Sequence, residues 1–418
     1  MTISLSRRQA LIGTAATVAA AKALFPAGAH AAGRGPEVSG ARLGFIALTD
    51  SSPVIIAKEM GLFAKYGMPD VEVAKQASWA ATRDNLVLGS QGGGIDGAHI
   101  LSPLPYLITT GQAATATPMY ILARLNVNGQ AISVGNDLKN VQVGLNSSGL
   151  KAKFAQMKAA GNMAKVAMTF RGGTHDLWLR YWLAAGGVNP DVDCSTIVIP
   201  PPQMVANMKA GTQDAFCVGE PWNGQLVSQK VGYTATTTSE IWMNHPEKAL
   251  GMRADWVDKH PNAARALIAA TMESAQWCEK NRAAMCAITA GRQYINVPTG
   301  DIVPRLQGTI DYGDGRKVTN SPHIMKFWND FAAFPFKSHD AWFITENKRW
   351  GNFSAGLDTN ALVNKVNRSD LWREVAKQYG IATPATDSRG VEKFFDGKVF
   401  DPSNPDAYLA SLAIKKLA

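Results

Sequence analysis

Two successive series of short apolar runs, each alternating with segments of helical pattern, constrain the fold of this chain more than any other feature. The first series opens with a predicted strand over residues 42–48. Ser52-Pro53 then supplies a helix cap and a proline for the first helical turn. The second series opens with a predicted strand over residues 141–145. Such alternation is typical of a parallel sheet covered by helices on both faces, so the sequence predicts an α/β fold with two similar units.

The remaining predicted elements continue the alternation until about residue 244. In the first unit, we expect strands at 71–73 and 97–100 and helices at 80–88 and 102–110. In the second unit, we expect helices at 151–160, 174–185 and 203–209 and strands at 166–170, 196–199 and 215–218. From residue 244 onward the pattern is largely helical.

This order of elements favours two lobes around a cleft. Lobe 1 would comprise residues 40–130 plus 243–418, and lobe 2 would comprise residues 131–242. The crossovers between the lobes are expected near 126–135 and 238–242, and the long C-terminal part would complete lobe 1 or wrap around it. Open α/β sheets place their ligands at the carboxyl ends of the strands, which is where the cleft would lie.

Residues 1–31 have the pattern of a cleavable export signal. A pair of arginines precedes an apolar stretch, and Ala29-His30-Ala31 matches a small-residue cleavage site. An amphipathic helix is disfavoured because Lys22 is the single charge in residues 10–29, and the alanine-rich stretch argues against a membrane anchor. The paired arginines favour the twin-arginine export route. We therefore expect a free periplasmic protein, since no lipobox cysteine follows the signal.

The net charge of +9 at pH 7 is spread thinly along the chain. Three of the basic residues, Arg7, Arg8 and Lys22, would leave with the signal. The rest form no block of five or six Lys or Arg, which argues against a nucleic-acid partner. A mildly positive field instead favours the approach of small anions.

The four cysteines do not define a metal site or a disulfide framework. Cys278 and Cys286 lie eight residues apart in a predicted helix, so about 12 Å separates them and they cannot pair. Cys194 and Cys217 either form a disulfide or remain buried free thiols, and the sequence leaves both open. Neither a zinc spacing nor a calcium loop is present in the sequence, so we expect no metal ligands.

His175 is the first candidate for a binding residue. It would lie in the first turn of the helix predicted over 174–185, beside free backbone N–H groups and the positive end of the helix dipole. Such a position binds anions without requiring a charged side chain. The alternative is a partly exposed histidine that contacts no ligand.

Two further candidates lie where the predicted cleft would open. Trp79 follows the second strand, and its indole N–H can only donate a hydrogen bond, which suits a ligand that only accepts. The polar stretch 126–130, which includes Gly129 and Gln130, lies at a predicted crossover and could donate an amide into the cleft. The alternatives are a core tryptophan and a plain surface turn.

Motifs of covalent and cofactor chemistry are absent from the sequence. The glycines at 92–94 do not follow the G-x-G-x-x-G order, and neither G-x-S-x-G, H-E-x-x-H nor a phosphate-binding P-loop occurs. No pair of carboxylates stands out for acid–base catalysis. The sequence therefore indicates a binding protein rather than an enzyme, without a cofactor.

Several segments together resemble the nitrate/bicarbonate-type solute-binding proteins of ABC importers. The matching segments are 43–50 (LGFIALTD), 57–67 (AKEMGLFAKYG), 77–79 (ASW), 128–132 (NGQAI), 173–182 (GTHDLWLRYW), 241–248 (IWMNHPEK) and 390–402 (GVEKFFDGKVFDP). The resemblance implies a two-lobed periplasmic binding protein of type II-like fold. It also implies a small planar oxyanion in the interlobe cleft and delivery to a membrane permease of an ABC importer.

Carried over by position, the resemblance implies a pocket built by a small set of side chains. These are Trp79, Gln130, His175 and Lys248, with Gly129 and Pro221 as lesser candidates. Nitrate has three acceptor oxygens and no donor, so a ring made only of donors would satisfy it with charge-assisted hydrogen bonds. Bicarbonate carries an O–H that such a ring leaves unbonded. Lys248 therefore favours nitrate, with nitrite as a second ligand.

Other readings remain open at the level of sequence. Bicarbonate is the alternative within the same family, and calcium would be involved only in that case. Aliphatic sulfonates or taurine would fit if Trp79 and His175 do not form the pocket. Pyrimidine-synthesising enzymes and cytoplasmic nitrate sensors share the fold, but residues 1–31 argue against both.

Overall fold

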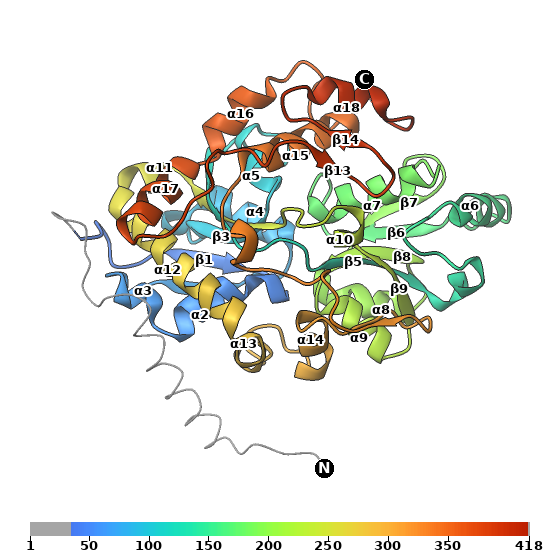
Figure 1. Cartoon of the computed structure of the whole chain (residues 1–418), viewed down its shortest axis with the longest axis horizontal. Coiled ribbons are helices and arrows are strands. Elements are labelled where there is room, and N and C mark those ends of the chain that lie inside the picture. Colours follow the sequence, from blue (N-terminus) through green and yellow to red (C-terminus); the bar gives the residue numbers. More distant parts are fainter. Residues whose placement is uncertain (1–34, 417–418) are drawn as a thin grey trace, which may run out of the picture.

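The computed structural model describes residues 35–416, so the predicted signal at 1–31 lies outside the described residues. Figure 1 shows these residues arranged around two five-stranded sheets, each flanked by helices. Sheet 1 has the order β2 (Glu72–Lys75), β1 (Arg42–Phe45), β3 (Gly97–Leu101), β10 (Lys248–Arg253), β4 (Met119–Arg124). Sheet 2 has the order β7 (Ser195–Val198), β6 (Lys165–Met168), β8 (Ala215–Gly219), β5 (Gln130–Gly135), β9 (Gly232–Thr237).

The two sheets are mixed, so the prediction of purely parallel sheets was wrong. In sheet 1, β1 is parallel to β2 and β3, whereas β10 is antiparallel to β3 and β4. In sheet 2, β6 is parallel to β7 and β8, whereas β5 is antiparallel to β8 and β9. The antiparallel strands are those by which the chain enters sheet 2 and returns to sheet 1, so they run against the strands of the βαβ series.

Four of these strands, β4, β5, β9 and β10, were missed by the sequence analysis, and one predicted strand does not form. In the predicted strand 141–145, Val141 ends the short helix η3 (Asn136–Val141), and Gln142 has φ 52°, a left-handed conformation that interrupts an extended strand. β10 was missed because Lys248, Gly251 and Arg253 break any apolar alternation, although five of its six residues are buried. The mainly helical pattern expected from residue 244 onward therefore begins only after β10.

The predicted helices of the two series form close to their expected bounds. α7 (Thr174–Ala185) has the predicted bounds, and α4 (Trp79–Leu88) begins one residue earlier than expected. The other helices of this part are α2 (Ser52–Glu59), α3 (Leu62–Lys65), α5 (Leu104–Thr109), α6 (Gly149–Ala159), α8 (Met204–Lys209), α9 (Trp222–Ser228) and α10 (Thr238–Ile241). The returning chain adds α11 (Ala254–Lys259), α12 (Pro261–Lys280), α13 (Arg282–Thr289), α14 (Thr299–Leu306), α15 (Lys337–Arg349), α16 (Thr359–Val366), α17 (Ser369–Gln378) and α18 (Pro405–Ser411). The two-residue strand pairs β11 (Ile310–Asp311) with β12 (Lys317–Val318) and β13 (Glu392–Lys393) with β14 (Val399–Phe400) lie outside the main sheets.

Two segments connect the sheets, and both lie beside a third stretch of chain around Lys326. Residues 125–129 lead from β4 to β5, so the crossover predicted at 126–135 is shorter than expected because strand β5 occupies its second half. Residues 238–247 return from β9 to β10. Val127 bridges both Pro246 and Lys326, and its N–H donates to the Lys326 carbonyl at 3.0 Å. The connection between the sheets is therefore a small three-stranded band of backbone.

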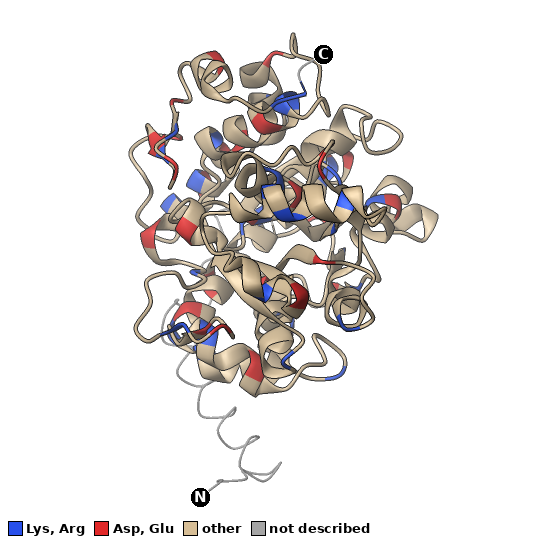
Figure 2. Cartoon of the chain, turned by 90° about the vertical axis from the view of Figure 1, so that its right-hand side faces the viewer, with Lys and Arg blue, Asp and Glu red and all other residues tan. Residues whose placement is uncertain are grey.

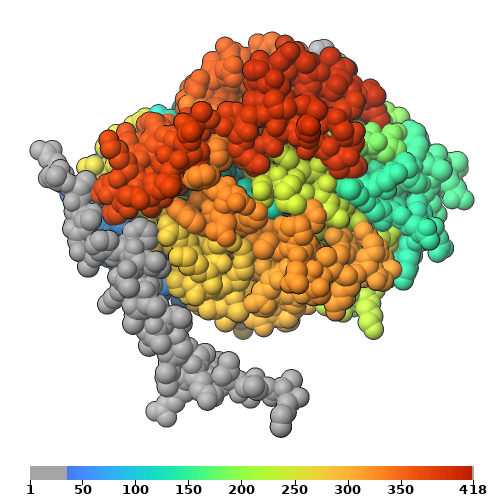
Figure 3. All heavy atoms as spheres, in the orientation of Figure 1, coloured from blue at the N-terminus to red at the C-terminus, as the bar shows by residue number. Residues whose placement is uncertain are grey.

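The C-terminal part of the chain packs against the cores of both sheets. Trp342 and Phe343 of α15 join the apolar cluster of sheet 2, where the ring of Trp342 stacks on Trp178 at 4.7 Å. Trp372 of α17 joins the cluster beneath sheet 1. Figure 3 shows the C-terminal residues as a continuous band along the upper edge, from the side of α17 across to that of sheet 2. Within residues 35–416, none of the helices combines the length and apolar character that a membrane crossing requires.

Candidate functional site

Four predicted site residues converge between the two sheets. Gln130 begins β5 and Lys248 begins β10, while Trp79 begins α4 and His175 lies in the first turn of α7. All four side chains are buried, with at most 1% of their surface exposed. The strand and helix ends of both sheets therefore bring an amide, an ammonium, an indole and an imidazole to one place. The alternative of a partly exposed His175 does not hold.

Asp50 lies at the centre of this group and was missed by the sequence analysis. Its carboxylate accepts hydrogen bonds from Gln130 Nε2 at 3.0 Å and from His99 Nε2 at 2.7 Å. Lys248 Nζ forms an ion pair with the same carboxylate at 3.0 Å. Burial opposes the ionisation of Asp50, but Lys248 and His99 outweigh burial and hold the pKa of this carboxyl well below its usual range. Asp50 is therefore a carboxylate held by three donors.

Glu247 supplies a second buried carboxylate next to Lys248. Its oxygens accept hydrogen bonds from Lys248 Nζ at 2.7 Å, Thr174 Oγ1 at 2.9 Å and Trp178 Nε1 at 2.6 Å. Burial raises the pKa of Glu247. Burial alone would lower the pKa of Lys248, but Asp50 and Glu247 outweigh this effect, so the pKa of Lys248 is raised. The expectation of a ring made only of donors was incomplete, since two carboxylates share one ammonium.

The hydrogen bonds of His175 fix where its proton lies. Its Nε2 is 2.8 Å from Gln130 Oε1, which can only accept because Gln130 Nε2 donates to Asp50. His175 Nε2 therefore carries the hydrogen, and Nδ1 lies 2.5 Å from Thr169 Oγ1, which donates to it. Burial, and next to it Lys248, holds the pKa of His175 well below its usual value, so the ring is neutral.

His99 adopts the same tautomer for a different reason. The backbone N–H of Ile46 points at His99 Nδ1 at 3.4 Å, so Nδ1 acts as an acceptor and Nε2–H donates to Asp50. Burial lowers the pKa of His99. A second proton on this ring would face a backbone donor, so the surrounding structure keeps His99 neutral.

Trp79 contributes a donor that its surroundings leave unused. Its indole Nε1 is buried and has no hydrogen-bond partner in the part of the chain that the structure describes. Lys248 Nζ lies 5.9 Å from the centre of the Trp79 ring system, and the His99 ring lies 5.4 Å from it. Buried donors without partners are rare and costly, so this N–H is suited to a ligand acceptor. Together with Lys248, it fits a small oxyanion.

Gly129 and Pro221 belong to the backbone that frames the site. Gly129 has φ 85°, and a Cβ at this position would lie 2.3 Å from Met325 Cε, so a larger residue would be strained and would displace Met325. Its carbonyl accepts the N–H of Glu220 at 3.1 Å, and Pro221 follows Glu220 through a cis peptide bond. The chain at 219–221 therefore lies directly against the crossover that carries Gln130.

Metal ligation receives no support from the described residues. Within residues 35–416, no cluster of three or more His, Cys, Asp or Glu is placed to hold a metal ion. Cys194, Cys217, Cys278 and Cys286 are buried free thiols, which settles the choice left open for Cys194 and Cys217. Figure 2 shows basic and acidic positions interspersed on one side of the ribbon.

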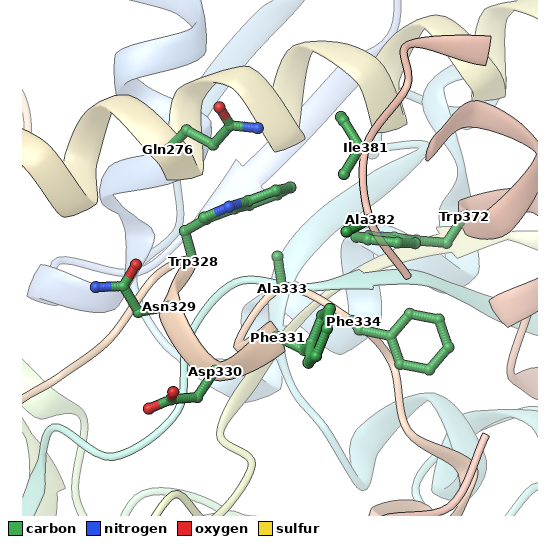
Figure 4. Close-up of a pocket in the computed structure, with 10 residues that line it drawn as sticks. All are labelled: Gln276, Trp328, Asn329, Asp330, Phe331, Ala333, Phe334, Trp372, Ile381 and Ala382. Atoms are coloured by element: carbon green, nitrogen blue, oxygen red, sulfur yellow. The ribbon is translucent and has the colours of Figure 1, made fainter. Parts of the chain in front are cut away.

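A separate cavity of about 480 Å³ is lined by residues of α12, of η5 (Asn329–Phe331) and its flanks, of α17 and of 381–382. Figure 4 shows the rings of Trp328, Phe334 and Trp372 around it, with Gln276 and Asp330 at its edge. None of the four converging residues contributes to its lining. Its aromatic lining differs from the charged and amide-rich site between the sheets.

Comparisons with known proteins place this chain among solute-binding proteins. Residues 34–290 match the NMT1-like family. The chain is 59% identical over 392 residues to the nitrate/nitrite binding protein NrtA of Synechococcus elongatus, covering 92% of this chain and 88% of that protein. It is 42% identical to the bicarbonate-binding protein CmpA of the same organism, covering 91% and 88%. The crystal structure of the periplasmic nitrate-binding protein NrtA from Synechocystis superposes with a TM-score of 0.88 at 57% identity, covering 91% of this chain and all of that chain.

Proposed function

This chain belongs to the NMT1-like family, and we propose that it is an extracytoplasmic solute-binding protein that captures nitrate, and also nitrite. In this role it delivers the anion to the membrane permease of an ABC importer. The protein acts by binding rather than by catalysis, as do the relatives it resembles at 59% and 42% identity.

One observation carries the proposal: four donors converge in a buried site, and one of them has no acceptor. Lys248 supplies a positive charge, Gln130 and His175 supply N–H groups, and the Trp79 indole N–H is unpartnered in the described chain. A planar monoanion with three acceptor oxygens and no donor matches such a set. Gly129 and Pro221 hold the backbone that frames it.

The arrangement of the chain also supports a closing motion. We propose lobes at 40–130 plus 243–418 and at 131–242, joined by the band in which Val127 bridges Pro246 and Lys326. His175 belongs to lobe 2, whereas Trp79 and Lys248 belong to lobe 1. Gln130 lies at the boundary, as the last residue of 40–130 and the first residue of β5. Ligand capture would therefore draw the lobes together around the anion, a hinge motion at the band.

A periplasmic location fits both the sequence and the relative from Synechocystis. Export by the twin-arginine route rests on residues 1–31, which lie outside the described part. The test is a fusion of residues 1–31 to a reporter that folds in the cytoplasm. Its export should depend on the twin-arginine translocase and stop when Arg7 and Arg8 are both changed to lysine, since that pair defines the signal.

Bicarbonate is the second candidate, and one observation favours it. Asp50 and Glu247 are buried acceptors beside Lys248, and either could accept the O–H that distinguishes bicarbonate from nitrate. Both oxygens of each carboxylate already take donors from the protein, so nitrate remains the better match.

Isothermal titration of the mature protein distinguishes the candidates. The titrants are nitrate, nitrite, bicarbonate with and without calcium, and taurine. Nitrate binding at micromolar or tighter Kd with little heat from bicarbonate is the expected result. Binding of bicarbonate alone would keep the transport role but contradict nitrate as the ligand. Absence of binding to all five titrants would overturn the proposed function.

A further inference from the structure

The charges of the site do not balance for an anion. Two carboxylates, Asp50 and Glu247, share the single ammonium of Lys248, and all three side chains are fully buried. A bound monoanion would therefore bring three negative charges against one positive charge. An unpaired buried charge is strongly unfavourable, so a further positive charge has to enter with the anion.

A proton is the simplest such charge, and the geometry separates the groups that could take it. Asp50 accepts bonds from three donors, so a proton on it would displace one of them. Burial raises the pKa of Glu247, but this carboxylate also accepts from three donors, and a proton on it would weaken its bond to Lys248. His99 offers Nδ1, which the backbone N–H of Ile46 already occupies as a donor, and a backbone N–H cannot reverse its role. None of these three groups takes a proton without loss of a hydrogen bond.

His175 differs because its free nitrogen faces a hydroxyl. Nδ1 lies 2.5 Å from Thr169 Oγ1, and a hydroxyl can rotate from donor to acceptor. On protonation, Nδ1–H would donate to Thr169 Oγ1, while Nε2–H keeps its donor role towards Gln130 or a bound anion. We propose that the anion binds together with one proton, which His175 takes up on Nδ1 with Thr169 as the positioning residue.

Besides burial, the titratable groups that act most on His175 are Lys248, His99 and His245, which lower its pKa, and Asp50, which raises it. Glu247 precedes β10 and Cys217 lies on β8. On α7 itself Asp176 is bound to Arg180 at 2.8 Å. α15, which packs against α7, carries His339 and the pair of Glu346 and Arg349, bound at 3.2 Å. Burial keeps His245 and His339 neutral and the thiol of Cys217 protonated. Lys248 therefore stands out as the cation nearest to His175, at 3.5 Å from Nε2.

This inference rests on the proposed function, and calorimetry in two buffers tests the two separately. The mature protein is titrated with nitrate at pH 7 in phosphate and in Tris, whose ionisation enthalpies differ. The difference in heat gives the number of protons taken up, which should approach one per nitrate. Kd should tighten as the pH falls from 8 to 6, by up to about tenfold per pH unit. Equal heats and a constant Kd would overturn the inference, whereas absence of any nitrate binding would overturn the proposed function instead.

Variants at position 169 test the assignment to His175. Thr169→Val removes the acceptor for Nδ1–H, so proton uptake should fall and nitrate should bind about tenfold more weakly at pH 7. Thr169→Ser is the matched control, because it retains the hydroxyl and should restore both quantities. Proton uptake by Thr169→Val equal to that of the unchanged protein would overturn the role of Thr169.

A second variant keeps the test decisive if the valine variant does not fold. His175→Gln keeps an amide N–H near the position of Nε2 but cannot take a proton in this pH range. It should bind nitrate without proton uptake, and its Kd should not depend on pH. Undiminished proton uptake by His175→Gln would assign the proton to another group and overturn the inference.

Discussion

At the scale of single residues, the site is defined by which polar atoms are already satisfied. Asp50, Glu247 and Gln130 have partners on each oxygen, whereas the Trp79 indole N–H has none among residues 35–416. Removal of a satisfied group breaks a network, while removal of an unsatisfied one costs the unliganded protein little. Substitution of a satisfied group should therefore lower both nitrate affinity and stability, whereas substitution of an unsatisfied one should lower nitrate affinity alone.

Trp79→Phe is the cleanest test of this separation. The change deletes an N–H without a partner, so the free energy of unfolding should change by less than about 1 kcal/mol, while nitrate affinity should fall roughly tenfold or more. Trp372→Phe is the matched control, because Trp372 Nε1 is also buried and has no hydrogen-bond partner in the described chain, but Trp372 lines the cavity in Figure 4. Titration calorimetry and urea unfolding measure both effects. Equal nitrate affinities for the two variants would remove Trp79 from the site.

Lys248 should behave in the opposite way. Lys248→Met leaves Asp50 and Glu247 without their shared cation, which should cost about 3–5 kcal/mol of stability as well as nitrate binding. Adding Asp50→Asn to Lys248→Met should recover part of the stability but no nitrate binding, because one uncompensated charge is removed without restoring the ammonium. Urea unfolding of the single and double variants measures this coupling. Strict additivity would show that Asp50 and Lys248 do not interact.

The sequence could supply some of these residues and not others. Trp79, Gln130, His175 and Lys248 were found through their segments, and the structure brings them together. Asp50 was missed because a lone aspartate after a strand carries no motif; its position at the carboxyl end of β1 was the available signal. The hydrogen-bond partners of a buried group are often distant in the sequence; Asp50 and Gln130, for example, are 80 residues apart.

At the scale of elements, helices with strong local signals were predictable, whereas the strands β4, β5, β9 and β10 were not. α7 was found because its apolar residues share one face and Gly186-Gly187 ends it; its N-cap is Gly173 rather than Thr174, which is the first helical residue. β10 was missed because Lys248, Gly251 and Arg253 break the apolar pattern and because its place between β3 and β4 depends on pairing with residues far away in the sequence. The mixed direction of the sheets follows from the same long-range pairing.

The crossover from β4 to β5 gives a prediction at this scale. Gly129→Ala places a Cβ against Met325 at a residue with φ 85°, so the variant should lose about 1–3 kcal/mol of stability. Gly300→Ala is the control, because a Cβ at Gly300 in α14 meets no atom within 4 Å and an alanine there should be neutral or slightly stabilising. Thermal unfolding compares the two. Equal melting temperatures would show that the crossover relaxes without cost.

At the scale of the whole molecule, buried histidines couple stability to pH. Burial lowers the pKa of His99, His175 and His339, and that of His245 to about 3. In the unfolded chain these rings titrate near about 6.5. The unfolded state therefore binds more protons below this pH, and the stabilisation is lost as the pH falls.

Stability should thus be constant from pH 8 to about 6.5 and then decrease, by up to about 1.4 kcal/mol per pH unit for each buried ring. The contribution of His245 continues to fall towards pH 3. Asp50, whose pKa is depressed in the fold, adds a loss only below about pH 4. Urea unfolding at pH 8, 6.5 and 5.5 tests this, and His245→Asn should flatten the slope. A stability that does not change between pH 8 and 5.5 would contradict the neutral buried rings.

The packing of Trp342 on Trp178 has a consequence for how the protein is made. Trp178 belongs to α7, near the middle of the chain, and the rings of Trp342 and Phe343 of α15 pack against it, while Phe394, after β13, stacks on Trp342. A ribosome releases those residues last, so a nascent chain holds an aromatic surface uncovered until synthesis is nearly complete. The aromatic core around Trp178 is therefore completed only near the end of translation. A chain cut short is thus marked by exposed tryptophan, which chaperones and proteases recognise.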